Sequence, residues 1–145
     1  MHIQIAIRVL GILMMMFSFT MLPPIFVSLI YQDGNESSFI RALAITFVVG
    51  FSLWLVFRRY DADMRIKDGF LITVLYYLAL GIFGALPFVD NQGPNLSLPD
   101  GLFESFSGLT TTGATVIIGL DNLPESILYY RQQLQWLGGM GIIVL

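Results

Sequence analysis

The run Thr110-Thr111-Thr112-Gly113-Ala114-Thr115 follows a predicted helix that is too short to cross a membrane. This helix covers residues 98–108, with Ser97 as its N-terminal cap and Pro99 and Asp100 in its first turn. At about 1.5 Å per residue it spans only about half of a hydrocarbon core of about 30 Å. Irregular backbone at that depth is tolerated only when it is buried in protein or lines a watery cavity. The pattern therefore predicts a re-entrant segment.

The residue types in this run favour ion coordination by the main chain. Threonine disfavours a continued helix and Gly113 opens backbone conformations closed to other residues, so the run is predicted to extend with successive carbonyls turned one way. Such carbonyl rows replace the hydration shell of potassium in channel filters. The negative end of the short helix's dipole also favours a cation there. The alternative is a threonine-rich piece of an ordinary membrane helix, with its hydroxyls bonded to preceding carbonyls.

The composition indicates an integral membrane protein. Hydrophobic residues make up 56% of the chain and charged residues 12%, and the mean hydropathy is +0.77. A net charge of -3 gives no reason to expect a nucleic-acid partner. The chain has no cysteine, which excludes disulfides and zinc-thiolate sites. No enzyme is expected, because the single histidine is His2 and the common catalytic and phosphate-binding motifs are missing.

Three apolar segments precede the short helix and are long enough to span a bilayer: residues 3–30, 39–57 and 69–89. Pro23 and Pro24 are predicted to kink or end the first span, since both lack an amide donor. A signal peptide is the alternative to this span, but no small-residue cleavage pattern follows it. Ser37 or Ser38 is expected to cap the second span, with Arg41 snorkelling to the interface. Arg41 could instead be a buried functional charge.

The basic residues of the loop at 58–68 determine the predicted topology. Because Lys and Arg concentrate on the cytoplasmic side of membrane proteins, this loop and the N-terminus are predicted to be cytoplasmic. The loops around Asp33, Asn95 and Asn122 then face outward, and the short helix enters from that outer face.

A fourth helix is predicted from residue 123, with Asp121 or Asn122 as its cap. It is still apolar at Leu145, and a helix that stopped there would strand its carbonyls in hydrocarbon. We therefore expect the chain to be a fragment of a longer protein.

Together these elements predict an all-α integral membrane protein in two parts. Residues 1–68 form two N-terminal transmembrane helices and a cytoplasmic basic loop. Residues 69–145 form a first pore repeat, namely a helix at 69–89, a re-entrant pore helix at 98–108, a filter loop at 110–115 and a second helix from 123, truncated at 145. A ring of carbonyls needs about four such units.

Residues 102–115 (LFESFSGLTTTGAT), Arg131 and residues 135–141 (QWLGGMG) resemble the first pore repeat of the TrkH-type membrane subunits of the Trk/Ktr/HKT potassium transporter superfamily. The likeness extends to residues 67–70 and 85–88 and covers essentially the whole chain. It implies potassium uptake across the bacterial inner membrane, with three further pore repeats in the same polypeptide. It also implies a homodimer in membrane lipid and a cytoplasmic nucleotide-binding regulatory subunit, TrkA.

The resemblance also implies where potassium binds. The ion's ligands fall on the backbone carbonyls of Thr110, Thr111, Thr112 and Gly113, with Thr111 and Thr112 as the first candidates. Gly138, Gly139 and Gly141 are expected to let the fourth helix pack closely against this filter.

Two charged residues are candidate supports for the filter. Glu104 on the pore helix either buffers cations electrostatically or is hydrogen-bonded by nearby backbone donors. Arg131 either anchors the outer return loop through charge-assisted hydrogen bonds or lies at the membrane interface.

Two other functions are compatible with the sequence. In a non-conducting assembly or scaffold subunit, residues 110–115 would only pack. A sodium-permeable member of the same superfamily would conduct with less discrimination, because a filter with a single glycine is less constrained than one with two.

Overall fold

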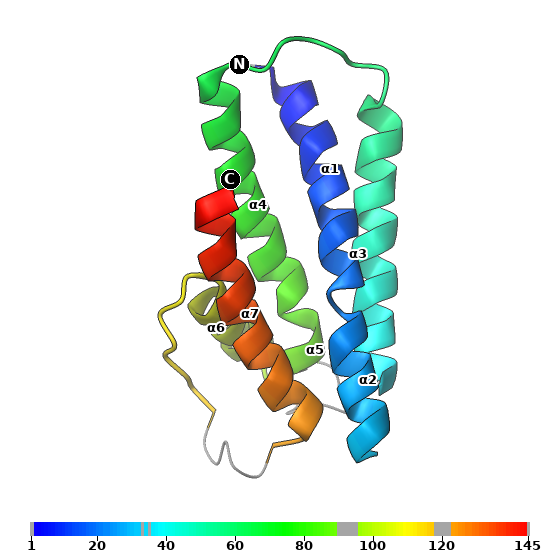
Figure 1. The fold of residues 1–145 in the computed structure, drawn as a ribbon, viewed down its shortest axis with the longest axis vertical. Helices are drawn as coiled ribbons and strands as arrows, with labels where there is room; N and C mark the ends of the chain where they lie inside the picture. Colours follow the sequence, from blue (N-terminus) through cyan, green and yellow to red (C-terminus); the bar gives the residue numbers. More distant parts are fainter. Residues whose placement is uncertain (1, 33, 35, 90–95, 118–122, 145) are drawn as a thin grey trace.

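The computed structural model describes residues 2–32, 34, 36–89, 96–117 and 123–144, and every regular element in these ranges is a helix. The helices are α1 (Ile3–Phe19), α2 (Leu22–Tyr31), α3 (Glu36–Phe57), α4 (Ile66–Gly84), α5 (Leu86–Val89), α6 (Leu98–Leu109) and α7 (Glu125–Val144) (Figure 1). Within the described ranges, three segments are long and apolar enough to cross a membrane: Ile3–Tyr31, Glu36–Phe57 and Ile66–Val89. The predicted all-α membrane fold is confirmed.

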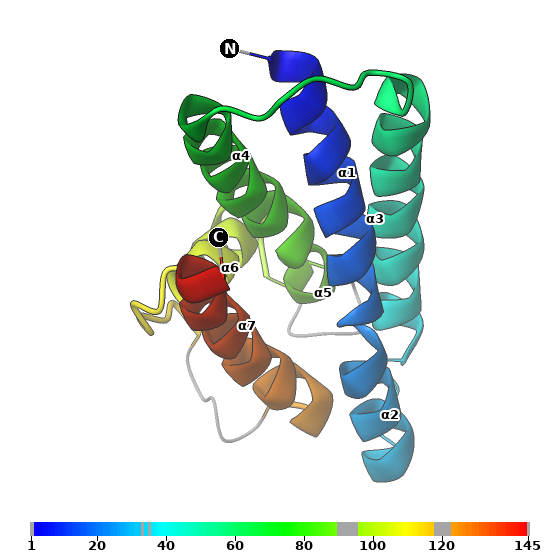
Figure 2. The same cartoon turned by 45° about the horizontal axis from the view of Figure 1, so that its top comes forward.

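Helix α1 is the centre of the bundle. It packs against α3 on one side and α4 on the other, and α6 and α7 lie beyond α4 (Figure 2). At the crossing of α1 and α3, a Cβ on Gly11 would lie 2.7 Å from the Gly50 carbonyl oxygen, and a Cβ on Gly50 would lie 2.8 Å from that of Gly11. The two backbones therefore approach as closely as small residues allow.

Tyr130 of α7 packs against both α3 and α5. Its ring is fully buried, with centroids 5.4 Å from Phe39 of α3 and 5.3 Å from Phe88 of α5. Its hydroxyl donates to the Gly84 carbonyl oxygen at 2.6 Å, so this buried polar group is satisfied.

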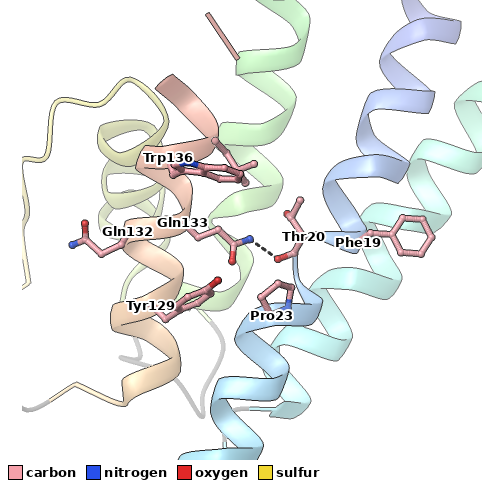
Figure 3. A pocket seen from close by; sticks show the side chains of 8 residues that line it. Phe19, Thr20, Pro23, Tyr129, Gln132, Gln133 and Trp136 are labelled. Carbon is pink, nitrogen blue, oxygen red and sulfur yellow. Dashed lines mark hydrogen bonds between the residues drawn. The ribbon is translucent and has the colours of Figure 1, made fainter. Parts of the chain in front are cut away.

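The first span is broken at Thr20 and Met21, one residue before the two prolines. A continuous helix would use the amide of residue 24 to bond the Thr20 carbonyl, and Pro24 has no such amide. Gln133 of α7 supplies the missing donor, because its Nε2 donates to the Thr20 carbonyl oxygen (Figure 3). Tyr129 and Trp136 flank Gln133 along a cavity of about 530 Å³. The broken span thus depends on a side chain from the pore repeat.

The second and third spans begin earlier than predicted. Helix α3 starts at Glu36, which places Ser37 and Ser38 inside its first turn, so the prediction that either serine is the cap is wrong. Glu36 suits the positive end of the helix, and its Oε2 accepts a hydrogen bond from Ser28 Oγ at 3.0 Å. Helix α4 starts at Ile66 because Asp68 Oδ2 accepts the Arg65 amide at 3.0 Å.

The third span also divides near its far end. Helix α4 ends at Gly84 and α5 follows from Leu86, where the prediction had one helix over 69–89. Pro87 explains the division, because it lacks the amide that would bond the Phe83 carbonyl.

The N-terminus and the connection from α3 to α4 lie at the same end of the bundle (Figure 1). The His2 amide donates to Asp68 Oδ1 at 3.0 Å. Arg8 Nη1 donates to the Tyr60 carbonyl oxygen at 2.8 Å. Asp33, Asn95 and Asn122, which the sequence predicts in outer loops, lie outside the described residues, as do the predicted cap Asp121 and Leu145.

Helix α7 begins at Glu125, two residues later than predicted, and is not among the three segments apolar enough to span by composition. Its polar residues cluster at 131–135, and two of them, Arg131 and Gln133, are buried against the rest of the chain. The helix therefore places these two polar side chains in protein contacts, whereas Gln132 between them is exposed.

Candidate functional site

The pore helix α6 positions the candidate loop. Its first turn carries Pro99 and Asp100 as predicted, and Ser97 takes the cap position, although the Ser97 hydroxyl makes no capping hydrogen bond. The helix packs against α4 and α7 and ends at Leu109, one residue beyond the predicted end.

The first residues of the threonine run form a turn at the end of α6, and irregular backbone follows this turn. The Thr110 amide donates to the Phe106 carbonyl at 2.9 Å, and the Thr112 amide donates to the Ser107 carbonyl at 3.0 Å. The prediction of an extended run from Thr110 is therefore wrong for its first two residues, because the amides that follow α6 donate hydrogen bonds to the last carbonyls of the helix. The turn that follows α6 ends at Thr111.

Two residues of the run have left-handed backbone conformations: Thr111 with φ of 58° and Gly113 with φ of 75°. In an extended strand successive carbonyls alternate in direction, and residues of opposite hand interrupt that alternation. The left-handed region is unfavourable for a β-branched residue such as Thr111, so this conformation stores strain in the loop.

The hydroxyls of the loop bond to one another and to α6. Thr110 Oγ1 donates to the Phe106 carbonyl at 2.7 Å and lies 2.9 Å from Thr112 Oγ1. Ser107 Oγ donates to the Ala114 carbonyl at 2.6 Å. Residues 110–116 are nevertheless exposed along their outer side, since no described part of the chain covers them.

A buried ion pair lies behind the loop. Glu104 Oε2 accepts from Arg131 Nε at 3.1 Å, and the two side chains are only 1% and 10% exposed. Glu104 Oε1 accepts from Thr115 Oγ1 at 2.5 Å and from the Val116 amide at 2.7 Å. The carboxylate thus ties the outer limb of the loop to α6 and α7 through charge-assisted bonds in a buried site.

The glycines of α7 face different neighbours. A Cβ on Gly138 would lie 1.9 Å from the Leu109 carbonyl oxygen, whereas one on Gly139 would lie 3.7 Å from Thr111 Cγ2. Gly141 faces α4, where a Cβ would lie 2.9 Å from the Tyr77 hydroxyl. Gly138 and Gly139 therefore lie at the end of the pore helix and Gly141 does not.

Several residues of this arrangement carried no sequence signal that we recognised. Tyr77 Oη donates to the Gly138 carbonyl at 2.8 Å and so holds the glycine segment of α7 to α4. Ser107 Oγ donates to the Ala114 carbonyl and so joins the last turn of α6 to the loop. A small hydroxyl residue in the last turn of a pore helix is the pattern that would have indicated Ser107.

Residues 35–145 match the family model TrkH, described as a cation transport protein. The chain is 55% identical over 145 residues to the Trk system potassium uptake protein TrkH of Halomonas elongata, covering 100% of this chain and 30% of that protein. It is 50% identical to the protein of the same name from Escherichia coli K12, with the same coverage.

A solved structure gives the same result for the fold. The chain matches the crystal structure of the potassium transporter TrkH from Vibrio parahaemolyticus with a TM-score of 0.93 and 50% identity, over 100% of this chain and 31% of that one. The chain thus spans about 30% of the length of these relatives. The resemblance carried by residues 102–115 and 135–141 is confirmed, and the chain belongs to the TrkH family of cation transport proteins.

Proposed function

We propose that the full-length protein takes up potassium across the bacterial inner membrane, and that this chain supplies one quarter of its selectivity filter. The observation that carries the proposal is the exposed loop at 110–116 on the end of a half-crossing helix, in a chain similar over its whole length to potassium uptake proteins. The ion-binding groups are the backbone carbonyls of Thr110, Thr111, Thr112 and Gly113, and potassium is the bound and transported ion.

Three features support this assignment of the carbonyls. The amides of Thr112 and Gly113 are bonded to the Ser107 carbonyl, which fixes the loop to the pore helix from behind. The Ala114 carbonyl accepts the Ser107 hydroxyl, which ends the coordinating row at Gly113. The C-terminal end of α6 brings its negative dipole to the same place.

The rest of the filter comes from other parts of the assembly. We propose three further pore repeats in the full-length polypeptide, a homodimer surrounded by lipid, and a TrkA-like nucleotide-binding subunit on the cytoplasmic side. A ring of carbonyls around one ion requires such repeats, because one loop reaches the ion from one side only.

Rubidium uptake by threonine variants of the full-length protein tests main-chain coordination. Thr111→Val keeps the β-branched shape without the hydroxyl and should retain uptake. Thr112→Val loses the contact to Thr110 Oγ1, so its rubidium uptake should fall at most about fivefold. Thr112→Pro removes the amide that bonds Ser107 and should abolish uptake. Abolished uptake in Thr111→Val at normal membrane abundance would refute carbonyl-only coordination there, and normal uptake in Thr112→Pro would remove the loop from the pore.

A labelling experiment tests the proposed topology, with the N-terminus and the loop at 58–65 cytoplasmic. In a cysteine-free full-length background, an impermeant thiol reagent added to intact cells should label Ser97→Cys and not Met64→Cys. Both residues are exposed. Permeabilised cells should show labelling at both sites. Labelling of position 64 from outside would invert the topology.

The Glu104–Arg131 pair gives a third prediction. Glu104→Gln or Arg131→Gln alone leaves one buried charge without its partner, which typically costs about 3–5 kcal/mol. Each single variant should therefore lower both the thermal stability and the rubidium uptake of the full-length protein. The double variant Glu104→Gln/Arg131→Gln should lose less stability than the two single losses added together. Strictly additive losses in this double-mutant cycle would show that the two charges do not act as a pair.

A further inference from the structure

A recess of about 280 Å³ lies between α3 and α5. Its lining is polar at one end and apolar at the other. The polar residues are Ser38 and Arg41, and the apolar ones are Ala42, Ile45, Leu86 and Val89.

Ser38 supplies an unsatisfied polar group at this recess. The residue is 1% exposed, and its Oγ has no hydrogen-bond partner among the residues that the structure describes. A buried hydroxyl left unpaired costs about 1–3 kcal/mol, so its presence indicates a partner that occupies the recess.

Arg41 brings a positive charge to the same end. It is exposed, and its Nε donates to the Ser37 carbonyl at 3.3 Å, which directs the guanidinium toward the start of α3. A guanidinium binds phosphate oxygens through pairs of N–H groups. The N-terminal end of α3 adds its positive dipole. The acidic Glu36 lies two residues before Ser38, on the other side of the helix, where it accepts a hydrogen bond from Ser28 of α2.

The apolar end of the recess continues as a stripe along α3. Ile45 and Val48 follow Arg41 at the i+4 and i+7 positions and are 46% and 60% exposed. From Ser38 to Val48 the helix rises about 15 Å, which is half of a hydrocarbon core of about 30 Å. A free phosphate ion would leave this stripe unused, whereas a phospholipid would cover it with an acyl chain.

We propose that this recess binds one phospholipid through its phosphodiester, with Arg41 and the Ser38 hydroxyl as donors and an acyl chain along Ile45 and Val48. Helix α3 crosses the bilayer once, so the headgroup lies at the membrane face where α3 begins. The cationic guanidinium repels the ammonium of phosphatidylethanolamine, so phosphatidylglycerol is the preferred lipid. This site is independent of the ion-coordinating loop and of its proposed function.

A local fluorescence measurement on the full-length protein tests the proposal. In a cysteine-free background, Val48→Cys is labelled with bimane and the protein is reconstituted into phosphatidylethanolamine vesicles that contain increasing fractions of phosphatidylglycerol with brominated acyl chains. A second variant, Val74→Cys, carries the same label on α4 at a site that is 57% exposed. Quenching of the label at position 48 should saturate at a lower fraction of phosphatidylglycerol than quenching of the label at position 74.

Two variants locate the binding groups. Arg41→Gln should reduce the preference for phosphatidylglycerol at position 48 about fivefold. Ser38→Ala should reduce it severalfold. The matched control Arg59→Gln, an exposed residue at the opposite end of α3, should leave it unchanged. Equal quenching at positions 48 and 74, or an unchanged preference in Arg41→Gln, would overturn the proposal. Displacement of the brominated lipid by millimolar glycerol phosphate would also overturn it, because the recess would then bind a soluble phosphate.

Discussion

Gly113→Ala in the full-length protein should reduce the discrimination of potassium over sodium roughly tenfold while leaving membrane abundance near normal. Gly113 has φ of 75°, and a Cβ placed there would meet only Gln135 Nε2 at 4.0 Å. The substitution therefore causes no clash, and its cost is the left-handed conformation, about 1–2 kcal/mol for a residue with a Cβ. The loop relieves that strain by turning its carbonyls, and a misplaced carbonyl changes which ion fits.

Gly34 is a matched control for this experiment. Its φ is 78°, and a Cβ there would have no atom within 4 Å, so Gly34→Ala imposes the same strain far from the filter. Competition of sodium against rubidium uptake should be unchanged in this variant. Unchanged selectivity in Gly113→Ala, with abundance lowered instead, would favour the scaffold alternative, in which the loop only packs. Low sodium discrimination already in the unmodified protein would identify a sodium-permeable member of the family.

Among glycine-to-alanine substitutions in the pore repeat, Gly138→Ala should lower the stability of the protein most. The added Cβ would lie 1.9 Å from the Leu109 carbonyl oxygen and 2.6 Å from its carbonyl carbon, so the clash is with backbone and no side-chain rotation relieves it. Overpacking usually costs about 1–3 kcal/mol, and here it also displaces the end of the pore helix. We expect both the folded fraction and rubidium uptake to fall strongly.

Gly139→Ala, one residue along, provides the comparison. Its Cβ would lie 3.7 Å from Thr111 Cγ2, an ordinary van der Waals contact, and alanine favours a helix over glycine by about 1 kcal/mol. Unfolding temperatures can be measured by size-exclusion chromatography of heated samples. The unfolding temperature of Gly139→Ala should equal or exceed that of the unmodified protein, and that of Gly138→Ala should lie far below it. Similar unfolding temperatures for the two variants would contradict the close contact of α7 with the pore helix.

The sequence was sufficient to predict the parts of the fold that depend on local chemistry. Long apolar segments specify the three spans, and Pro99 with Asp100 specifies the start of the pore helix. Predictions failed where two local preferences compete. Glu36 takes the first turn of α3 that Ser37 or Ser38 was expected to cap, because a carboxylate also suits the positive end of a helix.

Contacts between distant residues were beyond prediction from one sequence. Glu104 and Arg131 were each a candidate support, yet nothing in the residues indicated that they pair across 27 positions. The geometry of residues 110–111 likewise depends on which amides the last carbonyls of α6 capture, and threonine propensity alone favours extension.

The bond from Gln133 to Thr20 also has a consequence for synthesis in the cell. Its two residues are 113 positions apart, and ribosomes add about 5–20 residues per second, so the Thr20 carbonyl waits roughly 6–23 seconds for its donor. During that interval the first span carries an unsatisfied carbonyl next to Pro24, a state that hydrocarbon disfavours by several kcal/mol. Helix α1 thus leaves the ribosome well before the residue that completes its hydrogen bonding, and the insertion machinery must tolerate it incomplete until α7 arrives.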